Sequence, residues 1–235
     1  MYQRIADSLL ERIEGGELLP GDLLPSEREL SRVFAVTRMT VRQALGALQA
    51  SGVVVPQQGK GTFVATRKIE RQAAMLVPFT LSMQRRGYFT QARVITIDLI
   101  QPEKSISADL ALARESLVYF ILRVRVINSE PILLERLTVP ESRFQGLDRF
   151  DLGKRSLYEV METEYGVRVM RARQSLEATV ATAYEAELLS VVTGSPLMLE
   201  RRVAYDENDR PVEHARDLFR GDRFRFITET APLEL

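Results

Sequence analysis

Residues 25–64 constrain the fold more than any other part of this chain, because they set three short segments in a fixed order. The run Ser26-Glu27-Arg28-Glu29 has the form of a capping box, in which the first and fourth side chains each bond the other residue's backbone amide. An apolar stripe follows at Leu30, Val33 and Phe34. These features predict a short helix that begins just after Ser26.

A second helix is predicted to begin near Thr37, because threonine is a good N-cap residue. Its buried face has apolar residues at spacings of three, four and seven, namely Val41, Ala44, Leu45 and Leu48. Gly52 stands at the helix end, where a left-handed cap is common. The other side of the first turn and a half carries Arg38, Met39, Thr40 and Arg42. Two short helices joined by a tight turn predict a helix-turn-helix, whose second helix lies in the DNA major groove.

A β-hairpin is predicted directly after the two helices. The β-rich runs at 53–55 and 62–64 flank a turn that contains Gly59, Lys60 and Gly61. Two glycines around one lysine let the backbone approach a groove closely, with a cation at the tip. By itself this could be an ordinary hairpin with a solvated lysine, but its position after the helix pair favours the wing of a winged helix-turn-helix.

Basic charge is concentrated in this segment, although the whole chain has a formal net charge of +0. Residues 26–68 hold seven arginines and lysines against two glutamates, whereas residues 1–25 hold two arginines against five acidic residues. Such placement suits a phosphate footprint on one face. A solvated charged surface is the alternative.

The stretch Tyr2–Val64 resembles the DNA-binding domain of GntR-type bacterial transcription regulators. The resemblance is carried by YQRIADSLLERIEGGELLPGDLLPSEREL, VTRMTVRQALGALQASGVV and QQGKGTFV. It implies that the PSER arginine contacts phosphate, that the start of the second helix reads bases and that the wing glycines enter the minor groove. The implied DNA-binding residues, with the lysine at the wing tip, are Arg28, Thr37, Arg38, Thr40, Arg42, Gly59, Lys60 and Gly61.

Arg38 and Arg42 are the best candidates for guanine contacts, because bidentate arginine is the commonest specific readout of a base. The alternative for both is salt bridging on the surface of the domain.

Length and composition limit the remaining possibilities. A chain of 235 residues with 45% hydrophobic residues predicts two packed domains, taken as residues 1–66 and 75–235 with a linker at 67–74. The absence of cysteine excludes disulfides and thiolate metal sites and fits a reducing cytoplasm. No signal pattern or membrane span is visible. With one histidine, His214, expected to be structural, we expect no metal and no cofactor.

The second half predicts an α+β fold with an antiparallel sheet. A short helix is expected at 80–86 with Thr80 as its N-cap, and a longer one at 156–165. Further helices are expected at 107–113 and 183–189, and strands at 93–100, 117–127, 132–139, 167–180, 197–205 and 211–219.

A weak internal repeat is visible in this half. Residues 108–137 and 183–218 each read as a helix, a strand with arginines, a turn before proline and a second strand. Two related half-units that face each other would leave a cleft between them. Chance similarity of two common patterns is the alternative.

The stretch Phe79–Phe226 resembles the UTRA domain of the HutC branch of GntR regulators. The matching pieces include RSLYEVMETEYGVRV and PVEHARDLFRGDRFRF. The resemblance implies an α+β fold similar to chorismate lyase, a small-molecule pocket and a homodimer. The helical ligand domain of the FadR branch fits poorly, because this half is rich in strands.

Two arginines point to the chemistry of the ligand. Arg123 and Arg125 are two apart on one strand and so share a face, which suits a phosphate, sulfate or carboxylate. Thr80 at a helix start would add backbone amides, and Glu135 could orient an arginine or accept a ligand hydroxyl. A solvated cross-strand ladder with Glu135 or Glu200 is the alternative.

The resemblance implies a set of effector-binding residues, and one of them departs from the family pattern. The set is Phe79, Thr80, Arg123, Arg125, Glu135, Ser156 and Phe219. Many family members have a tyrosine where this chain has Phe219, so one polar ligand contact is missing here.

These observations predict a DNA-binding regulator that a small anionic metabolite releases from a near-palindromic operator. The resemblance implies an operator with GT…AC ends, and repression is the family's common mode, although the sequence does not fix the sign. An enzyme that uses Glu135, Glu213 and the arginines is a competing class, but no nucleophile–base pair or phosphate loop is present. A non-specific nucleoid protein is the third class.

Overall fold

The computed structural model describes residues 1–57, 59–65, 68–76 and 78–230. The chain divides into two compact units, and the division falls after Ile69. The sequence places residue 58 in the wing, residue 66 at the domain boundary and residue 67 at the start of the linker, and these three lie outside the described residues.

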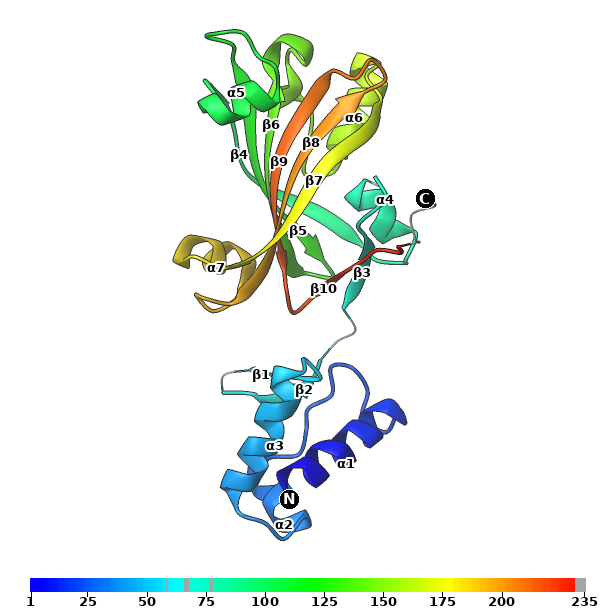
Figure 1. The fold of residues 1–235 in the computed structure, drawn as a ribbon, viewed down its shortest axis with the longest axis vertical. Coiled ribbons are helices and arrows are strands. Elements are labelled where there is room, and N and C mark those ends of the chain that lie inside the picture. The colour runs from blue at the N-terminus through cyan, green and yellow to red at the C-terminus, as the bar shows by residue number, and fades with distance from the viewer. Residues whose placement is uncertain (58, 66–67, 77, 231–235) are drawn as a thin grey trace, which may run out of the picture. The chain divides into compact units, whose positions relative to one another are not determined.

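The first unit has three helices followed by a hairpin (Figure 1). The elements are α1 (Tyr2–Glu14), α2 (Glu27–Val33), α3 (Arg38–Ala50), β1 (Val54–Gln57) and β2 (Gly61–Val64). Its core joins all of them through buried side chains that include Ile5, Leu9, Leu30, Val41 and Val64. The predicted winged helix-turn-helix is therefore the fold of this unit.

Both predicted helix starts are confirmed. The backbone amide of Ser26 donates to Glu29 Oε2 at 2.9 Å, and the amide of Glu29 donates to Ser26 Oγ at 3.3 Å. The amide of Thr40 donates to Thr37 Oγ1 at 3.3 Å. These bonds satisfy amides that the first helical turns leave without partners, so the two helices begin where the side chains fix them.

The two wing glycines have different structural reasons. Gly59 has a φ of +74° with open space where a Cβ would stand, so its requirement is conformational. Gly61 has a φ of +114°, and a Cβ there would lie 2.7 Å from Leu23 Cδ1. Leu23 forms an isolated bridge with Phe63 of β2, so Gly61 lets the loop before α2 pack on the hairpin.

The second unit is built on one antiparallel sheet of six strands, in the order β4-β5-β6-β9-β8-β7. The strands are β4 (Thr90–Ile100), β5 (Val118–Ile127), β6 (Glu130–Pro140), β7 (Val169–Val180), β8 (Pro196–Asp206) and β9 (Pro211–Arg220). The helices are α4 (Phe79–Gln84), α5 (Lys104–Asp109), α6 (Leu157–Tyr165) and α7 (Ala183–Leu189), with 3-10 turns η1 (Glu141–Arg143) and η2 (Leu147–Arg149).

The strand order has the symmetry of the internal repeat. Each half is a strand, a helix and a hairpin: β4, α5, β5 and β6 in the first, and β7, α7, β8 and β9 in the second. The halves join where β6 pairs with β9 from Leu133↔Phe219 to Thr138↔His214. The half-units therefore lie side by side in one sheet and do not face each other, because their inner strands pair directly.

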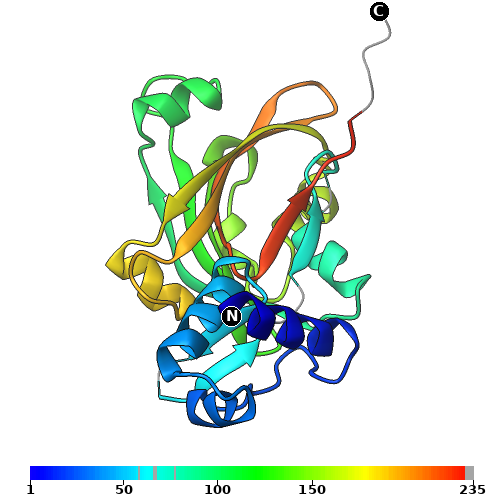
Figure 2. The same ribbon diagram turned by 60° about the horizontal axis from the view of Figure 1, so that its bottom comes forward.

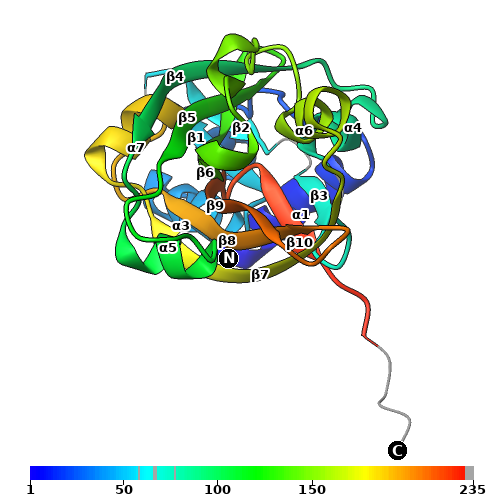
Figure 3. The same ribbon diagram turned by 90° about the horizontal axis from the view of Figure 1, so that it is seen from above.

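Helices cover both faces of this sheet, as the view from above shows (Figure 3). On one face, Leu157, Val160 and Met161 of α6 pack in a core with Ile121 and Leu137. On the other face, Ala186 and Leu189 of α7 pack in a second core that includes Leu122, Leu134 and Leu218. The alternation of side chains along β5 and β6 thus supplies a buried residue to each face in turn.

A second, two-stranded sheet consists of β3 (Ile69–Gln72) and β10 (Phe224–Ile227), and β10 is the red strand in Figure 2. Residues 67–74 were expected to be a linker, but Ile69–Gln72 of that segment form β3. Pairing with β10 supplies the backbone partners that this polar strand needs, and β3 has no periodic apolar pattern that predicts it.

Two expectations about short helices differ from the structure. The helix expected at 80–86 is α4, whose N-cap is Pro78, so Thr80 lies inside the first turn. The helix expected at 107–113 begins earlier, at Lys104. Both are single-turn helices of six residues, and in so short an element tertiary contacts outweigh local propensity.

Exchange of each wing glycine for alanine tests the conformational argument. We expect Gly59→Ala to destabilise the chain by about 1 kcal/mol, which is the cost of a left-handed L-residue. Gly61→Ala should cost about 3 kcal/mol, because φ is further from the left-handed well and Leu23 must move. Calorimetric unfolding of the full chain measures both, and equal effects would contradict the role assigned to Leu23.

Candidate nucleic-acid interface and effector pocket

The start of α3 presents its polar side chains to solvent. Thr37, Arg38 and Arg42 are exposed, and Thr40 is partly buried. The Thr37 and Thr40 hydroxyls lie 3.0 Å apart, so capping holds the two threonines together. Arg28 of α2 is also exposed. The predicted base-reading face is therefore available at the surface of its own unit.

Arg42 takes part in an ion pair. Its Nε lies 2.9 Å and 3.1 Å from the two carboxylate oxygens of Glu27 on α2. The side chain of Arg42 is still 63% exposed and that of Glu27 is 37% exposed. An exposed pair of this kind is worth at most about 1 kcal/mol, so a DNA contact can replace it. Glu27 joins the two helices and was not among the predicted site residues.

The wing tip carries exposed Gly59 and Lys60. The amide of Lys60 donates to the carbonyl oxygen of Gln57 at 3.0 Å, which closes the turn. Gly61 is exposed as well, but its contact with Leu23 gives it a reason within the domain itself. The tip thus offers one cation on a compact turn.

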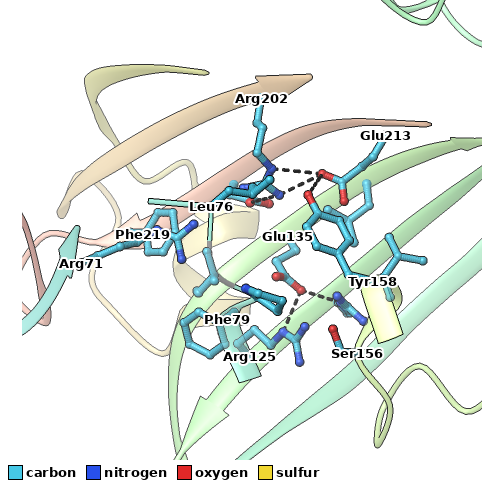
Figure 4. Close-up of a pocket in the computed structure, with 16 residues that line it drawn as sticks. Arg71, Leu76, Phe79, Arg125, Glu135, Ser156, Tyr158, Arg202, Glu213 and Phe219 are labelled. Carbon is cyan, nitrogen blue, oxygen red and sulfur yellow. Dashed lines mark hydrogen bonds and ion pairs between the residues drawn. The ribbon is translucent and has the colours of Figure 1, made fainter. Parts of the chain in front are cut away.

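A pocket lies on the α6 face of the six-stranded sheet (Figure 4). Its cavity has a volume of about 40 Å³. Six of the seven residues expected to bind an effector line it: Phe79, Arg123, Arg125, Glu135, Ser156 and Phe219. They come from α4, β5, β6, the N-cap of α6 and β9, so residues distant in sequence meet at one place.

Glu135 lies between the two predicted arginines. Its Oε2 accepts from Arg123 Nε at 2.5 Å and from Arg125 Nε at 2.9 Å. These three side chains are at most 6% exposed. Arg123 also donates to the carbonyl oxygen of Leu152 at 3.0 Å, and Arg125 donates to Thr80 Oγ1 at 3.3 Å. The cross-strand ladder considered above does exist, but it is buried instead of solvated.

The charges in this triad follow from its geometry. Burial by itself would raise the pKa of Glu135, but the Arg123 and Arg125 guanidiniums outweigh burial and lower it to about 2. Burial and the neighbouring Arg123 lower the pKa of Arg125 to about 10, so this arginine remains protonated at neutral pH. Two guanidiniums face one carboxylate, which leaves an excess of positive charge beside the cavity. That excess suits an anionic group.

Thr80 has a different role from the one expected. It does not cap a helix, and it does not line the cavity. Its hydroxyl accepts from Arg125, whose guanidinium carbon also lies 5.4 Å from the centre of the Phe79 ring. Thr80 and Phe79 therefore position Arg125, and a six-residue helix adds little dipole to the site.

Phe219 belongs to an aromatic cluster at one end of the pocket. Its ring centre lies 5.0 Å from those of Phe224 and Phe226, in edge-on geometry. The guanidinium of Arg71 on β3 lies 5.3 Å from the Phe219 ring centre. A phenylalanine at this position thus packs against β10 and stacks with Arg71, whereas a tyrosine would bring a hydroxyl into the cluster.

A second charged cluster lines the same pocket, and the sequence analysis did not predict it. Arg202 on β8 donates to Glu213 Oε1 at 2.9 Å and 3.1 Å and to Glu200 Oε2 at 2.7 Å. Asp217 Oδ2 lies 3.1 Å from Arg202 Nη2. Tyr158 of α6 donates to Glu213 at 3.3 Å, and burial raises the pKa of Tyr158 well above its ordinary value.

One signal for this cluster was present in the sequence. Charged residues recur at even spacing in these strands, two apart at Glu200 and Arg202 and four apart at Glu213 and Asp217. Alternation shows that such residues share a face, but only the strand order shows which strands are neighbours. Glu135 pairs with Asp217, and Asp217 pairs with Glu200, across three strands.

The described part of the chain lacks two other kinds of feature, a cluster of metal ligands and a membrane-spanning helix. No group of three or more histidine, aspartate or glutamate side chains is arranged to hold a metal ion. No helix there has the length and apolar character needed to cross a membrane. His214 lies on β9, its Nε2 is 3.7 Å from Asp109 Oδ2, and burial lowers its pKa.

Comparison with known proteins gives a consistent result for both units. Residues 1–64 match the model of the bacterial regulatory proteins of the gntR family, and residues 85–225 match the UTRA domain. The chain is 36% identical to the HTH-type transcriptional repressor NagR of Bacillus subtilis over 97% of this chain and 93% of that protein. It is 30% identical to a probable fructoselysine utilization operon transcriptional repressor of Escherichia coli K12, over 93% and 89%.

A solved structure agrees with the fold. PhnF from Mycobacterium smegmatis superposes with a TM-score of 0.68 at 28% identity, over 97% of this chain and 99% of that one. The superposition on PhnF therefore covers both units of this chain.

The buried triad makes a prediction for stability. Glu135→Gln should destabilise the chain by about 3–5 kcal/mol, because two buried guanidiniums lose their counter-charge. Glu177→Gln is the matched control, since Glu177 makes an exposed pair with Arg201 at 3.1 Å and should cost less than about 1 kcal/mol. Urea unfolding at neutral pH measures both variants.

The same carboxylate has a signed pH dependence. Its folded pKa of about 2 lies below the ordinary 4.5, so its contribution is complete above pH 4.5 and is lost as pH falls toward 2. The difference between wild type and Glu135→Gln should shrink over that interval. A difference that is constant with pH would contradict the assignment of charge to Glu135.

Proposed function

The chain belongs to the GntR family of bacterial regulatory proteins and carries a UTRA domain, and from this we propose that it is a ligand-responsive transcription regulator. Its relatives are transcriptional repressors and not enzymes. We propose that it represses transcription in the cytoplasm by binding an operator, and that a small anionic metabolite releases it.

The exposed polar face of α3 supports the DNA-binding part of the proposal. Arg38 and Arg42 can each form two parallel hydrogen bonds to a guanine edge in the major groove. Arg28 on α2 and Lys60 on the wing are exposed, and each can donate to a phosphate. Because Arg42 is held by Glu27 in the absence of DNA, its base contact requires exchange of one partner for another.

The buried arginine pair is the observation that carries the effector part of the proposal. A guanidinium has five N–H donors, and the described hydrogen bonds use two each in Arg123 and Arg125. The remaining donors can bind a phosphate or carboxylate. The names of several relatives refer to sugar compounds, such as fructoselysine and mannosyl-D-glycerate, so a sugar phosphate is the first class to test.

Effector binding requires the cavity to widen, because its volume of about 40 Å³ holds only a few water molecules and lies well below the roughly 300–1,000 Å³ of ligand pockets. Arg71, Leu76 and Phe79 line the cavity and belong to the segment that enters the second unit directly after Ile69. An effector that displaces these side chains therefore acts on the chain segment next to the DNA-binding unit. A coupling of roughly 1–3 kcal/mol is typical of such linkage.

We propose a homodimer as the DNA-binding form. Two winged helix-turn-helix units related by a two-fold axis read two half-sites, which explains why a near-palindromic operator is expected. Equal affinity for selected and random DNA would favour the nucleoid alternative, and activation on effector addition would reverse the sign of regulation.

Sequence readout makes the first functional prediction. Sites are selected from random DNA with the wild-type chain, and affinities for the best site and a scrambled site are compared. Arg38→Ala should reduce the discrimination by about 1–3 kcal/mol, the value of a bidentate base contact. Arg12→Ala on α1, whose arginine pairs with Glu17, is the control and should leave the discrimination unchanged. Unaltered discrimination by Arg38→Ala would count against this helix as the reader.

Effector response makes the second functional prediction. Arg125→Ala should leave affinity for the selected DNA site intact and should weaken release by sugar phosphates at least tenfold, because the anion loses one guanidinium. Arg201→Ala, on the opposite face of β8, is the control. Release titrations followed by fluorescence anisotropy give both values, and normal release of Arg125→Ala would move the effector site elsewhere.

A further inference from the structure

The two ends of the pocket differ in their proportion of arginines to carboxyl groups. The end at Glu135 has two guanidiniums for one carboxylate, as described above. The other end has three carboxyl groups, Glu200, Glu213 and Asp217, around the one guanidinium of Arg202. Arg71 is the nearest further cation, and its Nη2 lies 3.6 Å from Glu200 Oε2, beyond hydrogen-bond distance. Carboxyl groups therefore outnumber arginines at this end.

Asp217 differs from its two neighbours in its partners. Glu213 accepts from Arg202 and from Tyr158, and Glu200 accepts from Arg202 at 2.7 Å. Asp217 has one contact, from its Oδ2 to Arg202 Nη2 at 3.1 Å. Its Oδ1 is buried and has no hydrogen-bond partner among the described residues. Glu200 Oε1 is also buried without such a partner, but Asp217 lines the cavity and Glu200 is not among the lining residues.

This geometry decides where a proton resides. Burial, with Glu135, Glu200 and Glu213 nearby, raises the pKa of Asp217 well above its ordinary value, although Arg202 opposes this. Oδ2 faces an N–H donor, so the proton belongs on Oδ1. A buried O–H group without an acceptor is costly, and a ligand in the cavity can supply the acceptor.

We propose that Asp217 is a specificity-determining residue, which donates a hydrogen bond from Oδ1 to an oxygen atom of the effector. The proposal rests on the proposed function and deepens it. The effector then has an anionic group at the Arg123 and Arg125 end and a hydroxyl or carbonyl oxygen at the Asp217 end. A phosphorylated polyol or sugar has this chemistry, whereas inorganic phosphate satisfies only one end.

The ligand-free protein tests the protonation of Asp217. Because folding raises the pKa of Asp217, its contribution to stability is complete below the unfolded pKa and is lost as pH rises through the folded pKa. Asp217→Asn has no such loss, so it should raise Tm relative to the wild type, and the increase should grow as pH rises from 5 to 9. Glu135→Gln is the matched control, because Glu135 on β6 pairs with Asp217 on β9. This variant should lower Tm. Other charged and titratable groups face Asp217 and contribute to the pH dependence of Tm. They are Arg71, Arg123, Arg125, Glu135, Tyr158, Glu200, Arg202 and Glu213. A Tm lowered by Asp217→Asn as it is by Glu135→Gln would overturn the proposal.

Ligand binding tests the hydrogen bond. Calorimetric titration with glucose, mannose and fructose 6-phosphates first finds the tightest ester for the wild-type chain. Asp217→Leu, which has no donor, should weaken that ester at least tenfold and leave inorganic phosphate unchanged. Asp217→Asn, which keeps an N–H donor, should recover most of the loss. Unchanged affinity of Asp217→Leu for the ester would overturn the donor role. Equal losses of affinity in Asp217→Leu and Asp217→Asn would also overturn it, and would indicate that Asp217 is an ionised acceptor for an amine of the ligand.

Failure of the proposed function has a different signature. If the wild-type chain binds none of the three esters, the sugar-phosphate effector is contradicted, and the Tm series alone decides the state of Asp217. If the wild-type chain binds an ester and Asp217→Leu binds it with the same affinity, the proposed effector pocket is supported and the donor role of Asp217 is contradicted.

Discussion

One carboxylate shared by two guanidiniums sets the charge of the pocket in the second unit. Glu135 lies on β6, one of the two central strands, and fixes Arg123 and Arg125 of β5 beside the cavity. Without that carboxylate two buried cations would face each other. Because Glu135 lowers this cost without neutralising both guanidiniums, an excess of positive charge remains beside the cavity in a stable fold.

The position of the pocket follows from the symmetry of the sheet. Two strand–helix–hairpin units join through β6 and β9, and the row Arg123, Glu135, Asp217 and Glu200 runs across that joint. The first half supplies the cationic end and the second half supplies the acidic end. The two halves have corresponding backbones but different charged side chains. Together they form one site, with two arginines at one end and three carboxyl groups at the other.

The segment between the units links this site to the DNA-binding unit. β3 begins at Ile69, pairs with β10 and carries Arg71 to the aromatic ring of Phe219. A polar stretch that reads as a linker is therefore part of the pocket wall. The Phe219 ring packs among Phe224, Phe226 and Arg71 at one end of that pocket.

Local signals in the sequence determined the helix starts at Ser26 and Thr37, the wing and most strands, because capping and alternation act within a few residues. They also identified Arg123, Arg125 and Glu135. Only the tertiary structure decided that Glu27 holds Arg42, that Gly61 makes room for Leu23, that Thr80 supports Arg125 and that Asp217 faces the cavity. Those outcomes depend on which strands and helices become neighbours, and pairing between distant segments is set by the packing of the whole domain.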